Sequence, residues 1–309
     1  MLAIFLKTLP FFALIGLGYI AGRTRFFTAE ATAWLTRFVF YFALSAMLFR
    51  FAANLSLSEV FNWSFVLAYL SGTATVYLLA TGVAMLRRLS VAEAAIEAQC
   101  AVTGNVGFLG LPMLVLLLGP EAVGPNMLVL STDLIVFGSL VVILITGSRD
   151  GRLSPAVFRT VALGLIKNPM IVSIVLGLGW SALHLPTPAP MREFLELLSG
   201  AATPGALFVI GASLAAKSAE RLVIAGWLSF CKLFLHPLAV AMTSLMVFQV
   251  DRYSAGVMIA AASLPVAGNV FMLAQHYGVA PHRVSAAILV STVASIVTVS
   301  LAVALIGNL

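Results

Sequence analysis

Charged residues are scarce in this chain of 309 residues. Asp, Glu, Lys and Arg together make up 9% of the sequence and hydrophobic residues 61%, whereas a typical soluble domain has about 25% charged residues. The mean hydropathy is +1.10. No soluble packing of a chain this short could bury so much apolar surface. The composition therefore excludes a soluble globular protein and predicts a multi-pass protein embedded in a lipid bilayer.

Cysteines and catalytic motifs are also rare or absent. Cys100 and Cys231 lie singly in apolar stretches and form no metal or redox spacing. The sequence has no His-Glu-x-x-His, Gly-x-Ser-x-Gly or phosphate-binding Gly-Lys-Ser/Thr element. These absences predict that the chain is not an enzyme or an ATP-driven pump, and that it binds no metal or cofactor. The net charge of +6 is read as an orientation signal rather than as a nucleic-acid footprint.

Long apolar runs are abundant. A helix needs about 20 apolar residues to cross a bilayer, and this rule predicts ten spans: 3–21, 33–52, 63–86, 93–118, 124–147, 160–183, 193–215, 221–248, 255–277 and 281–307. The longest polar connection lies near the midpoint. We therefore divide the chain into a first five-helix repeat (1–148), a cytoplasmic connection (149–159) and a second repeat (160–309).

The two halves resemble each other in sequence. Gly-Asn-Val occurs at 104–106 and again at 268–270, and Gly-Leu-Gly-Tyr at 16–19 is echoed by Gly-Leu-Gly-Trp at 177–180. Two further matches follow in the same order at similar offsets. Because each copy has an odd number of spans, the second copy must enter the membrane upside down relative to the first, which predicts inverted repeats.

Basic residues in the short loops predict the orientation. One side collects ten of them and the other side four: Arg23, Arg25, Arg87, Arg88, Arg149, Arg152, Arg159, Lys217, Arg221 and Arg283 against Lys7, Arg50, Arg192 and Arg252. The richer side is expected to face the cytoplasm. Both termini are then extracytoplasmic.

Two apolar segments contain residues that interrupt a membrane helix. Residues 101–112 include three glycines, an asparagine and a proline, and residues 265–271 again contain a proline, a glycine and an asparagine. Interrupted helices are tolerated at membrane depth where they are buried in protein or line a cavity, and a matching pair points to a transporter binding site. Half-helix N-termini suit a carboxylate. We therefore predict a substrate site formed by Gly104, Asn105, Val106, Gly107, Pro112, Pro265, Gly268, Asn269 and Val270. The alternative is that the two asparagine amides only satisfy neighbouring broken backbone.

Ionisable residues deep in predicted spans are the second group of candidates. Asp133 and Lys232 each lie near the middle of a span, where an unpaired charge is costly and functional roles are common. Asp133 could titrate or bind a coupling cation, and Lys232 could neutralise Asp133 or an anionic substrate; a purely structural pair is the alternative. His236 shares a helix face with Lys232 and could relay protons or satisfy a carbonyl freed by Pro237. Glu97 could line an entrance or pair with Arg87 or Arg88.

Three motifs resemble those of the auxin efflux carrier family of permeases. The fourth-span motif is matched by residues 104–112 (Gly-Asn-Val-Gly-Phe-Leu-Gly-Leu-Pro), the eighth by 232–237 (Lys-Leu-Phe-Leu-His-Pro) and the ninth by 264–278. The resemblance runs over essentially the whole chain. It implies an all-α membrane protein with ten helices in two inverted five-helix repeats, in which the broken fourth and ninth helices cross. This is the fold of the bile-acid sodium symporters, in which a scaffold domain moves against a transport domain.

Residues and resemblance together predict a secondary transporter that moves a small organic anion, such as an auxin- or malonate-like carboxylate, by alternating access across a bacterial inner membrane. Coupling to H⁺ or Na⁺ stays open, as does a homodimer. The alternatives are a sodium-coupled symporter of the same fold, or a membrane receptor that binds a ligand without moving it.

Overall fold

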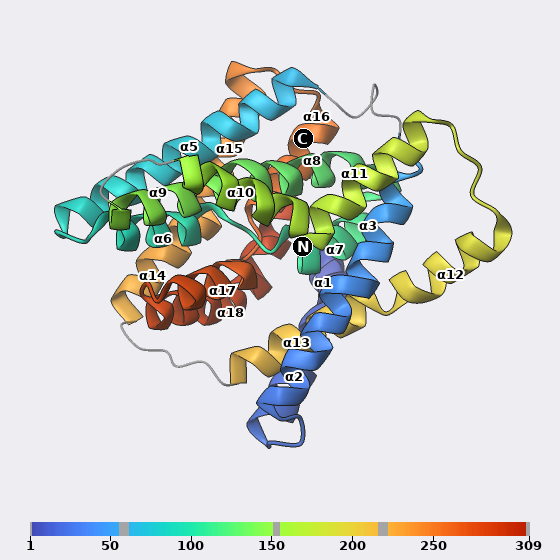
Figure 1. Ribbon diagram of the computed structural model, residues 1–309, viewed down its shortest axis with the longest axis horizontal. Coiled ribbons are helices and arrows are strands. Elements are labelled where there is room, and N and C mark those ends of the chain that lie inside the picture. The colour runs from blue at the N-terminus through green and yellow to red at the C-terminus, as the bar shows by residue number, and fades with distance from the viewer. Residues whose placement is uncertain (1, 56–61, 151–154, 216–221, 307–309) are drawn as a thin grey trace.

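The computed structural model describes residues 2–55, 62–150, 155–215 and 222–306. Within these ranges every regular element is helical, with an isolated β-bridge as the one strand-like pairing (Figure 1). The α-helices are α1 (Leu2–Arg23), α2 (Ala29–Phe38), α3 (Leu44–Ala52), α5 (Trp63–Leu86), α6 (Val91–Val102), α7 (Leu111–Leu118), α8 (Val123–Thr132), α9 (Gly138–Asp150), α10 (Pro155–Lys167), α11 (Pro169–Ala182), α12 (Ala189–Gly200), α13 (Ala202–Ala215), α14 (Leu222–Phe230), α15 (His236–Ala241), α16 (Arg252–Ala262), α17 (Gly268–Tyr277) and α18 (Pro281–Ile306).

Short π-helical turns join several of these helices into longer rods. They cover Val39–Ala43, Val106–Gly110, Asp133–Phe137, Cys231–Leu235 and Met242–Val247, and a 3₁₀ turn covers Pro120–Ala122. Among the described residues, six helical segments are long and apolar enough to cross a membrane: Ala29–Ala52, Trp63–Leu86, Pro120–Ser148, Ala189–Ala215, Leu222–Val247 and Pro281–Ile306. The predicted all-α membrane fold class is confirmed at this level.

The predicted sixth span, 160–183, is not a single straight helix. Val157–Lys167 and Pro169–Ala182 meet at an angle of 66°. Pro169 has no N–H and restricts the residue before it, so the helix cannot continue through this point. Asn168 adopts an extended backbone there, and its side chain caps α11 by accepting from the Met170 N–H at 3.0 Å. With this bent pair counted as one span, the number of candidate spans reaches seven.

The helices pack in two groups. In the first, which we call the scaffold group, α1 lies along α13, α3 lies along α11, and α2 and α12 pack against these pairs. In the second, the crossover group, α5, α6, α8, α9, α14, α15, α16, α17 and α18 pack on one another. Figure 1 shows α1, α2 and α13 together in the lower centre, apart from α5, α6 and α9 at the upper left. Helices far apart in sequence thus form each group.

Glycines set the closest helix contacts in the scaffold group. At Gly18 in α1, an added Cβ would lie 2.9 Å from the carbonyl carbon of Phe208 in α13. At Gly177 in α11, it would lie 2.7 Å from the carbonyl oxygen of Phe49 in α3. Small residues are enriched in membrane helix interfaces because they let two backbones approach. Gly18 and Gly177 lie 159 residues apart, as do Phe49 and Phe208. In each contact a glycine of one half packs against a phenylalanine of the other half, so the second contact is the first with the two halves exchanged. We call these the exchanged contacts.

Part of the sequence-based assignment lies outside the described residues. The predicted connection 149–159 includes residues 151–154, which lie outside the described residues. So do three of the fourteen basic residues used to predict the orientation, Arg152, Lys217 and Arg221.

Candidate functional site

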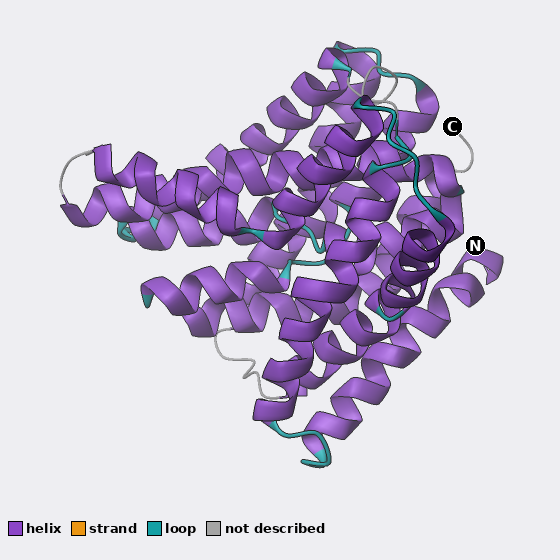
Figure 2. Cartoon of the chain, turned by 45° about the vertical axis from the view of Figure 1, so that its right-hand side comes forward, coloured by secondary structure: helices purple, strands orange, loops and turns teal. Residues whose placement is uncertain are grey.

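Two helix interruptions meet in the middle of the protein. The first runs from Thr103 to Asn105 between α6 and the π-helical turn Val106–Gly110, and the second separates α16 from α17. Gly104 and Val266 form an antiparallel bridge, in which the Asn105 N–H donates to Pro265 O at 2.9 Å and the Ala267 N–H donates to Thr103 O at 3.1 Å. Figure 2 shows both interruptions as loops among the central helices. The bridge satisfies backbone groups that a broken helix would otherwise leave unpaired in an apolar interior.

The two asparagines of the repeated Gly-Asn-Val are not in equivalent positions. Asn105 lies in the non-helical segment, and its carbonyl accepts from the N–H groups of Leu109 and Gly110 at 3.1 and 2.9 Å. Asn269 is the second residue of α17, which starts at Gly268. Asn105 is 7% exposed, and no hydrogen bond of its side chain is found within the described ranges. Its amide is therefore available to a ligand.

A cavity of about 1050 Å³ lies between the scaffold and crossover groups. The scaffold side is lined by α2, α13 and the start of α11, and the crossover side by both interruptions, α8, α17 and the start of α18. The lining residues include Ala29, Thr36, Arg37, Phe40, Gly104, Asn105, Val106, Gly107, Phe108, Asn168, Met170, Ser213, Ala267, Gly268, Asn269, Phe271, Gln275, His282 and Ser285. The volume is in the range of small-molecule sites.

The structure places the predicted substrate residues in two sets. Gly104, Asn105, Val106, Gly107, Gly268 and Asn269 line the cavity. Pro112, Pro265 and Val270 do not. Pro112 is the second residue of α7, past the interruption, Pro265 contributes its carbonyl to the bridge, and Val270 is fully buried in the hydrophobic core. The helix is therefore broken at Gly104 and not at Pro112.

Positive charge dominates the cavity. Arg37 lines it, and its guanidinium lies 4.7 Å from the centroid of the Trp34 ring. No Asp or Glu of the described residues lines the cavity. Arg37 was not selected from the sequence, although it is a charged residue within the predicted second span 33–52. The general rule that an intramembrane charge is a functional candidate applies to it as it does to Asp133 and Lys232.

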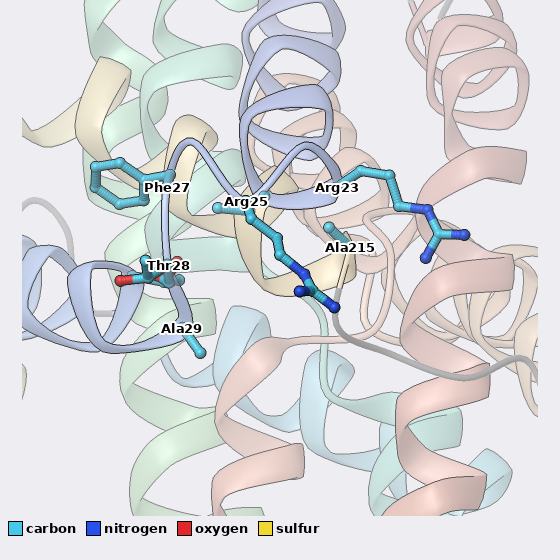
Figure 3. A pocket seen from close by; sticks show the side chains of 9 residues that line it. Arg23, Arg25, Phe27, Thr28, Ala29 and Ala215 are labelled. Atoms are coloured by element: carbon cyan, nitrogen blue, oxygen red, sulfur yellow. Dashed lines mark hydrogen bonds between the residues drawn. The ribbon is translucent and has the colours of Figure 1, made fainter.

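A smaller pocket of about 360 Å³ adjoins the cavity and adds two more arginines. Ala29, Thr32 and Ala212 line both spaces, and Arg23 and Arg25 line the smaller one, again without a carboxylate from the described part of the chain. In Figure 3 both arginine side chains extend away from Phe27. The combined space is therefore suited to a negatively charged solute.

The predicted coupling residues lie beside the interruptions but outside the cavity. Asp133, Lys232 and His236 are 3%, 0% and 0% exposed. Asp133 accepts from the Tyr69 hydroxyl at 2.8 Å, and no ion pair within 4.0 Å joins it to Lys232. Lys232 donates to Ala262 O and lies 3.1 Å from His236 Nδ1.

Several of these groups lie on irregular helical turns. Asp133 begins one π-helical turn, and Lys232 lies in another. Such turns occur often at functional sites. The opposite nitrogen of the His236 ring is 3.0 Å from Thr73 Oγ1, so a buried polar chain runs from α5 to the end of α16.

Comparison with known proteins places the chain in a family. A family model described as "Membrane transport protein" matches residues 3–303. A "Putative malonate transporter" of Rhizobium meliloti is 32% identical over 298 residues, which cover 94% of this chain and 92% of that protein. The "Uncharacterized transporter YfdV" of Escherichia coli is 25% identical over 95% of this chain and 94% of its own length. The "Lysosomal cholesterol signaling protein" of Mus musculus is 28% identical over 69% of this chain, but only 26% of its own length is covered.

The family model and the relative from Rhizobium meliloti each span nearly the whole chain, and both denote transporters rather than enzymes. The chain is thus a multi-pass membrane transporter that belongs to the membrane transport protein family, the auxin efflux carrier family that its three motifs resemble.

Proposed function

We propose that this protein is a secondary transporter that moves a small organic anion across a bacterial inner membrane by alternating access. The observation that carries the proposal is the composition of the cavity wall. Both helix interruptions and Arg37 line the cavity, with no carboxylate among the described lining residues. The first N–H groups of a helix have no intrahelical partner, so the start of α17 offers donors beside the free amide of Asn105. These groups together suit a carboxylate.

The position of the cavity supports alternating access. It lies between two groups of helices that are each packed internally, so one group can move against the other while the two interruptions stay paired. Rocking of one bundle against another around a fixed site is the usual mechanism in transporters with discontinuous helices. In this proposal the scaffold group stays in place, and the crossover group carries the substrate.

Exchanged contacts support two inverted repeats of five spans each, 1–148 and 160–309. If a two-fold axis relates the halves, a contact of Gly18 with Phe208 must be accompanied by a contact of Gly177 with Phe49, because the same offset of 159 residues relates both positions. Both contacts occur. We further propose that the basic side of the loops faces the cytoplasm, so that both termini are extracytoplasmic.

A small carboxylate is the proposed substrate class, and malonate is the first candidate because a relative is described as a malonate transporter. An anion that leaves a negative-inside cell gains about 2.3 kcal/mol per charge per 100 mV. This energy is sufficient for export without a coupled ion. The same electrical force opposes uptake, which would then need a coupled cation.

Flux measurements on sealed vesicles containing the purified protein test this function. We expect radiolabelled malonate to accumulate faster than in protein-free vesicles when the interior is held positive, and the uncharged malonamide to enter at the protein-free rate. Binding without flux would favour a receptor, and equal flux of malonate and malonamide would contradict an anion site.

Two variants test the site itself. Asn105→Ala and Arg37→Gln each remove a donor to the substrate, and a hydrogen bond to a charged group contributes about 1.5–3 kcal/mol. We therefore expect kcat/KM to fall about 10- to 150-fold. Arg192→Gln serves as the matched control because Arg192 is exposed on α12 and lines neither space. An unchanged kcat/KM in both site variants would move the site elsewhere.

A further inference from the structure

Lys232 is placed between the two helix interruptions. Its side chain is fully buried, and its ammonium donates to the carbonyl of Ala262, the last residue of α16. On the other side, a Cβ added to Gly104 would lie 3.2 Å from Nζ. The ammonium therefore touches the end of one half-helix and the bridge residue of the other. A side chain at position 104 would require the Lys232 side chain or Ala261 O to shift by a few tenths of an ångström.

This location is where a helical transporter would bind a coupling cation. The last carbonyls of a helix lack intrahelical partners and carry partial negative charge, and in transporters with broken helices such ends coordinate Na⁺. Here the carbonyl of Ala262 accepts from Lys232 instead. Asp133 is the acidic group that interacts electrostatically with this ammonium, and Asp133 Oδ2 is buried with no hydrogen-bond partner among the described residues.

We propose that the Lys232 ammonium is a built-in cation that occupies the place of a coupling Na⁺ and links the two half-helices, so that transport requires no sodium. This inference rests on the proposed transport function. A covalently attached cation holds the carbonyl end of α16 in every state of the cycle and cannot dissociate. It therefore supplies the structural effect of a bound Na⁺ without a Na⁺ gradient, and it argues against a sodium-coupled symporter.

The first arm of the test uses the wild-type protein in vesicles. The membrane potential is clamped with K⁺ and valinomycin, and external Na⁺ is replaced by N-methyl-D-glucamine at constant ionic strength. We expect initial rates of malonate flux to agree within about 1.5-fold. A stimulation of tenfold or more by Na⁺ would overturn the proposal, whereas the absence of any protein-dependent flux of carboxylates would count against the transport function instead.

The second arm needs no flux. Lys232→Ala removes the ammonium and leaves a space beside Ala262 O, so we expect its thermal unfolding temperature in detergent to rise with added Na⁺ or methylammonium but not with N-methyl-D-glucamine. Lys232→Met fills the space without charge and is expected to show no such rise. Lys167→Ala, which removes an exposed lysine at the end of α10, is the control for loss of charge.

Three outcomes of this arm would overturn the proposal: a Na⁺-dependent rise in the wild-type protein, an equal rise in Lys167→Ala, or no response of Lys232→Ala to any small cation. If Lys232→Ala fails to fold without additives, purification in methylammonium replaces the titration. Recovery of folded protein in methylammonium, but not in N-methyl-D-glucamine, is then the expected result, and equal failure in both would overturn the proposal.

Discussion

Replacement of Gly177 by alanine tests the helix packing that holds the scaffold group together. The new Cβ would lie 2.6 Å from Ala52 Cβ, 2.7 Å from Phe49 O and 3.1 Å from Ala53 N. Ordinary contact begins at 3.4 Å, so the methyl group would be about 0.7 Å too close to a backbone carbonyl that cannot rotate away. To accommodate it, α11 and α3 must separate.

The expected magnitude follows from two opposing terms. Overpacking of a tight contact typically costs about 1–3 kcal/mol, and the upper end applies because two of the three neighbours are backbone atoms. Alanine is a better helix former than glycine by about 1 kcal/mol. We therefore expect Gly177→Ala to lower the free energy of unfolding by about 1–2 kcal/mol.

Gly179 provides the matched control two residues away in the same helix. Nothing lies within 4 Å of a Cβ added there, so Gly179→Ala gains the helix propensity of alanine without a clash. The two variants should differ by about 2–3 kcal/mol, which corresponds to roughly 30- to 150-fold in the unfolding equilibrium constant, since 1.4 kcal/mol is a factor of ten.

Equilibrium unfolding in mixed micelles, titrated with SDS, measures this difference. The exchanged contact predicts the same result in α1, where Gly18 faces Phe208 and Gly16 faces open space. Equal midpoints for Gly177→Ala and Gly179→Ala would refute the close approach of α11 and α3. A clash in Gly177→Ala without one in Gly18→Ala would refute the equivalence of the two contacts.

Two further predictions concern the crossover group. Glu97, whose side chain is 2% exposed, pairs with Arg87 at 2.7 Å and with Arg283 at 3.1 Å. Glu97→Gln leaves Arg87 without a counter-charge and Arg283 with Glu93 alone, and it should destabilise the protein by about 2–4 kcal/mol. Glu93→Gln, which removes the other partner of Arg283 at a side chain 31% exposed, should cost less than about 1 kcal/mol, and equal shifts in unfolding temperature would contradict the difference in burial. Gly278 ends α17 with φ +64°, a left-handed conformation that a side chain disfavours by about 1–2 kcal/mol. Gly278→Ala should therefore lower the unfolding free energy by about 1 kcal/mol, although its Cβ meets open space. An unchanged midpoint of unfolding in SDS would show that the strain is relieved elsewhere.

The apolar content and the two interrupted segments made the membrane class, the helical segments and the approximate location of the two breaks predictable from the sequence. The shortage of charge excluded a soluble fold, and glycine, asparagine and proline within apolar runs marked residues 101–112 and 265–271 as interrupted segments. The structure has its breaks at residues 103–105 and 263–267, which overlap these two segments. The repeated Gly-Asn-Val also identified five of the residues that line the cavity. These features are local, so they can be read without knowing which helices are neighbours.

Tertiary packing alone decided which groups meet. The sequence offered Arg87 or Arg88 as the partner of Glu97, and the fold adds Arg283 from α18. It offered Asp133 or an anionic substrate as the partner of Lys232, whereas the folded chain directs Lys232 to Ala262 O. Equal tripeptides suggested equal asparagines, yet Asn105 lies in a non-helical bridge and Asn269 in a helix. Partner choice depends on the placement of helices whose contacting residues lie 30 to 186 positions apart, and a local pattern of residue types carries no information about that placement.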